Sequence, residues 1–355
     1  MTFQELSEED ARASGPVDIA LFTPLADEAG SVLRSVSGSI VRYRSGSQVF
    51  YRFTVAGRAR DYRCELTFAS AGDVPACFAT RALLASSPKT MVVVGIAAGM
   101  SQEVALGDIV VASQVHALFT HAAAVPGTGA TFGAKLSGRS FPATLRLVTE
   151  VQSFKHRPEY GAWQSQRLAA RSRVLTRRSG GPAALRGPDV QCHVAPVVTT
   201  PFVSKAKGFM RFARKRDRKA LALDNESAAV LETLHAEAPG TYCLVIRGIS
   251  DFGDELKNAL QPRDEAEVQA LAATNAFSLV LELAKVDAFS RAMLSGTRAQ
   301  VPELGDDELR PLAAHLELVF VVLHHCVRIG HVVERHDDVD RGVGEHRTVI
   351  AVERE

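Results

Sequence analysis

The sequence has few of the features that mark secreted, metal-binding or membrane proteins. Its five cysteines are odd in number and widely spaced, and no CxxC pair occurs, which disfavours a disulfide framework or a zinc site. Residues 1–14 are acidic and polar, unlike a signal peptide. The longest apolar run near the C-terminus, at 316–323, is too short to span a bilayer. We therefore expect a cytoplasmic protein.

The chain also has little net charge. A formal charge of +1 implies no overall attraction to nucleic acid or to a membrane. Residues 205–219 are locally basic, with eight basic residues and one acid. They are either a solvated helix face or a set of contacts for nucleotide phosphates. No nucleic-acid-binding motif is present, so we expect neither a membrane nor a specific nucleic acid as a partner.

Strand and helix patterns alternate along the chain. Buried strands are predicted from apolar runs at 17–22, 91–94, 108–112 and 244–246, antiparallel strands over 39–68, and helices over 73–84 and 266–284. A small-residue turn is predicted at 95–99. The alternation predicts an α/β fold with a largely parallel sheet covered by helices on both faces.

The predicted domain spans residues 15–288. Residues 122–188 are rich in Gly, Ser, Pro and Arg, which indicates an insertion at about 122–190. Residues 289–355 form an extension whose role the sequence does not indicate. Within this extension, His324, His325, Cys326 and His331 lack regular metal-ligand spacing.

Four segments fall where predicted strands end, which is where parallel α/β sheets bind ligands. They are TPLADEA (23–29), GIAAGM (95–100), ALDNESAAV (222–230) and VIRGISDFGD (245–254). In this order, and with LGDIVVA at 106–112, they resemble the superfamily of purine nucleoside phosphorylases and methylthioadenosine/S-adenosylhomocysteine nucleosidases. The resemblance covers about residues 17–115 and 193–286.

The resemblance implies a three-layer phosphorylase-type α/β fold with a mixed, largely parallel central sheet flanked by helices. It implies cleavage of the N-glycosidic bond of a purine nucleoside or nucleotide, without a metal or a cofactor. It also implies a homo-oligomer, with a dimer as the first expectation.

Two carboxylates match the family's catalytic pattern. The resemblance implies that Asp251 protonates the departing purine, a general-acid role, although an Asp at this place could instead cap a helix. It implies that Glu28, with Asp27 as its neighbour, activates water as in the hydrolytic nucleosidases. The alternative for Glu28 is an exposed acid in a first helical turn. Because no arginine stands in 23–29 or 92–94 to hold phosphate, hydrolysis is favoured over phosphorolysis.

The remaining predicted site residues bind substrate. Glu226 matches the family's ribose-binding glutamate, since a carboxylate can accept from two hydroxyls, or else is a first-turn helix acid. Asn225 stands where the family usually has methionine. A catalytically weak nucleotide-sensing module stays open because of Asn225 and Ile96. The resemblance further implies contacts from Ile96, Ala97 and Ser250, and base stacking by Phe202, for which a core position is the alternative.

Overall fold

The structure of the chain is a computed structural model, and it describes residues 2–120, 123–126, 132–135, 137–175, 189–215, 217–254 and 262–294. All of these lie in one compact unit, Met1–Gly296. The strands are β1 (Thr2–Glu5), β2 (Ile19–Thr23), β3 (Ser39–Ser45), β4 (Gln48–Val55), β5 (Tyr62–Phe68), β6 (Thr90–Gly99), β7 (Ile109–Ala117), β8 (Ala123–Pro126), β9 (Phe132–Lys135), β10 (Ser140–Pro142), β11 (Cys192–Thr199), β12 (Ala222–Asp224) and β13 (Tyr242–Asp251). The helices are α1 (Glu8–Ala13), α2 (Ala26–Arg34), α3 (Asp73–Leu84), α4 (Leu145–Phe154), α5 (Pro158–Leu175), α6 (Lys207–Arg214), α7 (Ser227–Glu237), α8 (Pro262–Lys285) and α9 (Ala288–Leu294).

The central sheet runs in the order β1-β3-β4-β5-β2-β6-β12-β11-β7-β10, and β13 pairs with both β6 and β7. Strand β2 is parallel to β5 and β6, and β13 is parallel to β6. Strands β3, β4 and β5 are antiparallel neighbours. The sheet is therefore mixed, as the resemblance implied.

Five of these strands close a ring. Strand β13 bridges β6 and β7, β7 pairs with β11, β11 with β12, and β12 returns to β6. Strand β6, which also pairs with β2, thus belongs both to the open part of the sheet and to the ring, whereas β13 belongs to the ring. Because they are covered on both sides, their side chains are almost wholly buried, which explains the continuous apolar runs in the sequence.

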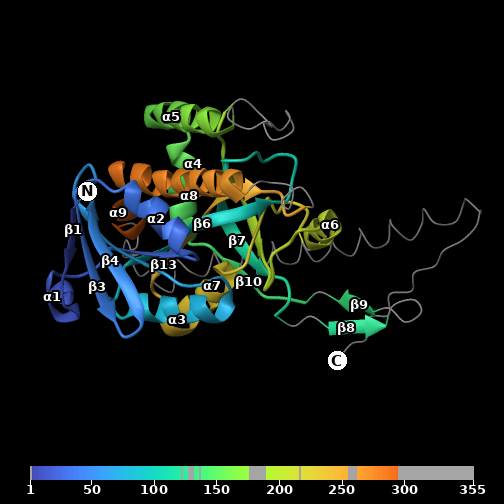
Figure 1. Ribbon diagram of the computed structural model, residues 1–355, viewed down its shortest axis with the longest axis horizontal. Helices are drawn as coiled ribbons and strands as arrows, with labels where there is room; N and C mark the ends of the chain where they lie inside the picture. The colour runs from blue at the N-terminus through green and yellow to red at the C-terminus, as the bar shows by residue number, and fades with distance from the viewer. Residues whose placement is uncertain are drawn as a thin grey trace, which may run out of the picture. The chain divides into compact units, whose positions relative to one another are not determined.

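Helices cover the sheet on its two faces (Figure 1). One core lies between the sheet and α2, α4, α8 and α9, with Phe154, Phe277 and Phe289 fully buried. The other lies between the sheet and α3 and α7, around Phe22 and Leu231. These two layers around the sheet confirm the predicted three-layer α/β fold.

The domain division stays a prediction. Strand β1, which precedes residue 15, pairs with β3 at the sheet edge. Within the predicted insertion, β8 and β9 form a separate two-stranded sheet, whereas β10 pairs with β7. Helix α9 extends past residue 288 and packs on α4 and α8. Residues 295–355 lie outside the described residues.

Candidate active site

A cavity of about 320 Å³ gathers residues from the ends of β2, β6, β12 and β13. Four chain segments that are far apart in sequence meet there, because the carboxyl ends of β2, β6 and β13 lie side by side. Of the predicted site residues, it is lined by Glu28, Ile96, Ala97, Asn225, Glu226, Ser250 and Asp251. The three carboxylates at 28, 226 and 251 therefore face a single space.

Glu28 lies in the first turn of α2 and points inward. Its side chain is only 4% exposed, whereas the neighbouring Asp27 is exposed. The alternative of an exposed helix acid is therefore wrong for Glu28. Burial raises the pKa of Glu28 to about 8, with Arg247 opposing the shift and Glu226 adding to it.

Arg247, on β13, lies close to Glu28 and was not among the residues predicted from the sequence. It is fully buried. Its Nη2 lies 2.6 Å from Oδ2 of Asp224 and 3.8 Å from Oε2 of Glu226. An arginine within the apolar strand sequence VIRGIS was a usable signal, because a charge in such a strand requires buried partners.

Two buried polar atoms near Gly95 lack partners. Among the described residues, neither Nη1 of Arg247 nor Oε2 of Glu28 has a hydrogen-bond partner. Both border Gly95, where a Cβ would come within 2.4 Å of Nη1 and 2.7 Å of Oε2. A glycine is therefore required here, because the side chains of Glu28, which lines the cavity, and of Arg247, which does not, leave no space for a Cβ.

Residues 95–99 are strand and not the predicted turn. They continue β6 to Gly99 and pair with β13 and β12. Glycine and alanine suit this place because three strands approach one another at the closure of the ring. Ile96 and Ala97 still line the cavity, as predicted.

Glu226 precedes α7 but does not cap it with its side chain. Its Oε1 instead accepts from the backbone N–H of Gly72 at 3.2 Å. Burial raises the pKa of Glu226, and Arg247 opposes that shift. The helix-acid alternative is therefore wrong, because the carboxylate is buried and faces the cavity.

A β-bulge presents Asp251 to the cavity. The register between β13 and β6 shifts between Ile249 and Asp251, so that the consecutive residues Ser250 and Asp251 both line the cavity. The Ser250 hydroxyl donates to Oδ2 of Asp251 at 3.0 Å, and the Gly253 N–H donates to Oδ1 at 2.8 Å. Asp251 does not cap α8, which begins at Pro262.

Asn225 faces the same cavity with a defined amide orientation. Its Nδ2 donates to the Thr200 carbonyl at 2.8 Å, which leaves Oδ1 as the amide atom for a ligand. The cavity is also lined by Glu265 and Gln269 of α8. The sequence did not predict these two residues, because they lie within a helix and not directly after a strand.

Phe202 is the predicted residue that the structure does not bring to the cavity. Its ring packs against Phe209 and Phe119, with centroids 4.9 and 5.2 Å away. The following residues, Val203 and Lys205, line the cavity instead. The predicted register was therefore displaced by one residue or more.

The described residues contain no group of three or more His, Cys, Asp or Glu side chains that could hold a metal ion. The histidines and the cysteine at 324–331 lie outside the described residues. Nor is any helix in the described part of the chain long and apolar enough to cross a bilayer.

The mixed sheet closes into a five-stranded ring with carboxylates at the strand ends, and comparison with known proteins identifies the family of this α/β protein. Residues 22–285 match the phosphorylase superfamily. The chain belongs to this superfamily.

Relatives within it include nucleosidases. Over 199 residues the chain is 27% identical to the ATP nucleosidase Cap17 of Escherichia coli (strain KTE188), a match that covers 54% of this chain but only 36% of that protein. Its fold is similar to that of 5'-methylthioadenosine/S-adenosylhomocysteine nucleosidase from Neisseria meningitidis, with TM-score 0.53, 18% identity and coverage of 76% and 98%. It is also similar to futalosine hydrolase of Helicobacter pylori, with TM-score 0.53, 14% identity and coverage of 78% and 97%.

Proposed function

We propose that this protein hydrolyses the N-glycosidic bond of a purine nucleoside or nucleotide and releases the free base. The observation that carries the proposal is the convergence of Glu28, Glu226 and Asp251 on one cavity. The burial of Glu28, one of whose carboxylate oxygens lacks a partner among the described residues, adds to this support. Family membership and the nucleosidases among the similar proteins support the same reaction class.

The nucleophilic water lies in the cavity beside Glu28, whose carboxylate accepts a water proton. The water oxygen then bonds to C1′ of the sugar as the bond from C1′ to the purine nitrogen breaks. A raised pKa makes Glu28 a stronger base than an exposed carboxylate, because burial disfavours its charged form.

The other two carboxylates act on the leaving base and on the sugar. Asp251, held by Ser250 and Gly253, faces the purine and supplies the proton that neutralises it as it departs. Glu226 accepts hydrogen bonds from the sugar hydroxyls. Asn225 offers a further acceptor at the same wall of the cavity.

Hydrolysis is favoured over phosphorolysis by the state of Arg247. Its guanidinium is already paired with Asp224 and lies beside Glu226. Among the described residues, the cavity lining includes no arginine. A phosphate nucleophile would therefore lack the bidentate partner that it requires.

The test is product analysis in buffer that is free of phosphate. The purified protein is incubated with adenosine, methylthioadenosine, S-adenosylhomocysteine, AMP and ATP, and the free base is separated by chromatography. We expect base release without phosphate. Release that strictly requires phosphate would identify a phosphorylase, and calorimetric binding without any product would favour a nucleotide-sensing module.

The replacement Asp251→Asn tests the role of the acid. It keeps the side-chain shape and removes the proton, so we expect kcat to fall by roughly 10²- to 10⁴-fold with an unchanged circular dichroism spectrum. Wild-type turnover by the variant would remove Asp251 from the mechanism.

We further propose a cytoplasmic homo-oligomer, first of all a dimer. The four cysteines among the described residues are free thiols, which fits a reducing compartment. On α3, Val74 and Phe78 lie one turn apart and are 65% and 63% exposed, an apolar face that a second copy could cover. Light scattering coupled to size-exclusion chromatography would measure the assembly, and a monomer at micromolar concentration would contradict it.

A further inference from the structure

The cavity is acidic in its interior. Its lining includes the carboxylates of Glu28, Asp224, Glu226, Asp251 and Glu265. The buried Arg247 offsets part of this charge, but it is paired with Asp224. Among the described residues, Lys205 is the one cation in the lining. An anionic group on a substrate is therefore repelled from the interior and attracted toward Lys205.

Lys205 begins the basic segment that the sequence singled out. Helix α6 buries Met210 and Ala213, which leaves the opposite helix face to solvent. Lys207 and Arg211, four residues apart, lie on that face and are exposed. We define Lys205, Lys207 and Arg211 as the basic rim.

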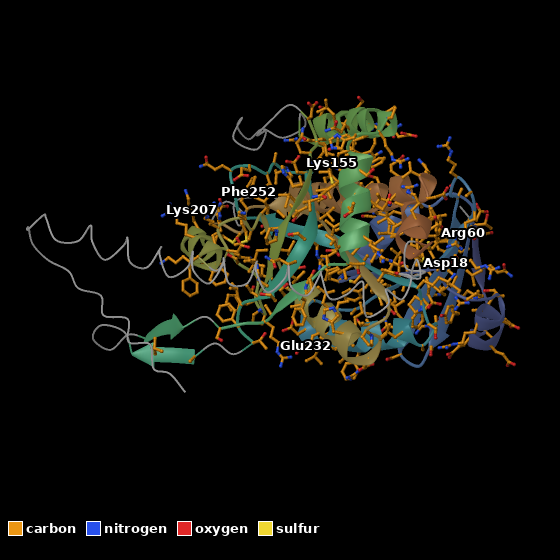
Figure 2. All side chains as sticks on the ribbon, turned by 180° about the vertical axis from the view of Figure 1, so that it is seen from behind. Asp18, Arg60, Lys155, Lys207, Glu232 and Phe252 are labelled. Carbon is orange, nitrogen blue, oxygen red and sulfur yellow. The ribbon has the colours of Figure 1, made fainter. Side chains whose placement is uncertain are left out.

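The basic rim is fixed next to the loop that carries Asp251. The Ser204 hydroxyl donates to the Gly253 carbonyl at 2.8 Å. Gly253 has φ +60, and a Cβ on it would come within 2.7 Å of Sδ of Met210, so α6 packs directly against this loop. Figure 2 shows Lys207 and Phe252 on the same side of the molecule.

A second anchor holds the far end of the segment. Nε2 of His116 lies 3.2 Å from Oδ2 of Asp217, and its Nδ1 lies 2.7 Å from the Ser140 hydroxyl. The segment from Ser204 to Asp217 is thus tied at both ends to the ring of strands. Lys205 therefore keeps its place at the edge of the cavity, and Lys207 and Arg211 follow it along α6.

We propose that the substrate is a purine nucleotide whose nucleoside part enters the acidic cavity while its phosphates lie on the basic rim. The proposal rests on the hydrolytic function proposed above and names its substrate class. No bond to phosphorus forms or breaks, and the products are the free base and a sugar phosphate. Lysine and arginine supply the cationic donors that bind phosphate.

The test compares kcat/KM for adenosine, AMP and ATP in the wild type and in a variant carrying Lys205→Ala and Arg211→Ala. A matched control carries Lys155→Ala and Arg44→Ala, which remove the same charges at exposed positions outside the cavity lining. Base release is measured in phosphate-free buffer at low and at physiological salt.

We expect the wild type to prefer the nucleotides, and more strongly at low salt. The rim variant should lower kcat/KM for the nucleotides by roughly 10- to 100-fold, since each contact to a charged group contributes substantially. Its kcat/KM for adenosine should stay within about threefold of wild type. The control should match wild type on every substrate.

Three results would overturn the substrate assignment while leaving hydrolysis intact. They are equal cleavage of adenosine and nucleotides by the wild type, equal losses on all substrates in the rim variant, and preferred base release from a single-stranded oligonucleotide. The last would assign the basic rim to a nucleic-acid strand. If no substrate releases base at all, the proposed function itself fails.

Discussion

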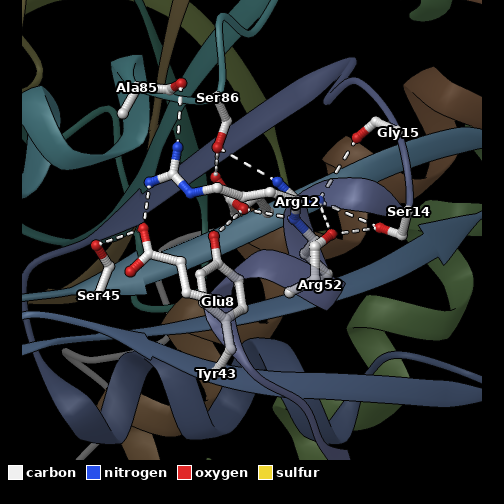
Figure 3. A network of polar contacts seen from close by, with 11 residues as sticks. Glu8, Arg12, Ser14, Gly15, Tyr43, Ser45, Arg52, Ala85 and Ser86 are labelled. Carbon is white, nitrogen blue, oxygen red and sulfur yellow. Dashed lines mark hydrogen bonds and ion pairs between the residues drawn. The ribbon is translucent and has the colours of Figure 1, made fainter.

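Two buried carboxylates, one on strand β5 and one on helix α2, illustrate how differently a fold can treat the same group. Glu65, on β5, is fully buried and has a full set of donors. It accepts from Tyr43, from Nε of Arg52 at 2.6 Å and from Ser86 at 2.6 Å. The wider network of Arg52, which also reaches the N-terminal residues Ser14 and Gly15, appears in Figure 3.

Glu28 is nearly as buried but is left incomplete. Its Oε2 has no partner among the described residues, and the nearby Arg247 also has a free Nη1. A satisfied buried network rigidifies a structure, whereas an unsatisfied one costs stability and needs a reason. The difference indicates that the Glu65 network stabilises the sheet, whereas Glu28, which lines the cavity, keeps part of its hydrogen-bonding capacity unused.

The largest expected effect that sharpens this comparison is on catalysis. Glu28→Gln keeps the volume and removes the base, so we expect kcat/KM for base release to fall by roughly 10²- to 10⁴-fold. The matched change Glu65→Gln should leave kcat/KM within a few fold in the folded fraction. Equal losses in both variants would erase the distinction between the two carboxylates.

The next effect is on stability, and here we expect the larger loss at Glu65 and not at Glu28. Glu65→Ala removes a fully buried acceptor that Tyr43, Arg52 and Ser86 share and should lower the free energy of unfolding by about 3–5 kcal/mol. Denaturant titration at neutral pH measures this loss. A loss below about 1 kcal/mol would show that the Arg52 network is not structural.

The pH dependence of the reaction tests the ionisation of Glu28. Because Glu28 must be ionised and its pKa is about 8, the active fraction of the base rises roughly tenfold per pH unit up to about pH 8. In the wild type this rise is opposed by deprotonation of the acid Asp251, so the residual turnover of Asp251→Asn, whose amide does not titrate, isolates it as a slope near one in log kcat/KM. A level rate from pH 5 to pH 8 in that variant would remove Glu28 as the base.

A last effect is the stability cost of Glu28 itself. Its pKa is raised from the ordinary value of 4.5 to about 8 in the folded protein, so ionisation destabilises the fold as pH rises through this window and costs nothing below it. Glu28→Gln should therefore match wild-type stability near pH 4.5 and exceed it toward pH 8. The gain is at most about 1.4 kcal/mol for each unit of pKa shift, and thermal melts at the two pH values measure it. A gain that is independent of pH would contradict this origin.

Much of the fold and of the site was predictable from sequence, because both depend on local patterns at strand ends. Apolar runs locate β2, β6 and β13, and the acids that follow them reach the cavity since parallel strands end at one edge. Glu28 rather than Asp27 was predicted from resemblance, and burial of its side chain agrees.

The features that the sequence did not predict are those that depend on how distant strands pair in three dimensions. Arg247 acquires its partners across strands, and the alanines and glycines at 95–99 look like a turn until β12 and β13 are seen to close upon them. The bulge at Ser250 turns Asp251 toward the cavity, and no local sequence pattern marks it. An error of one or a few residues in the predicted register placed Phe202 at the cavity. Nothing in the sequence spacing places Glu265 or Gln269 at the cavity.

The closed ring of strands has a consequence for how this cavity can diversify. Strand β13, which carries Arg247, Ser250 and Asp251, is hydrogen-bonded to a neighbour on each side, so its amides should be among the slowest in the molecule to exchange with deuterium. The side chains that we propose to act on the substrate are thus held by a rigid strand. Substitutions on the exposed face of α6 should leave that strand undisturbed, which makes this helix the place to begin redesigning the proposed specificity.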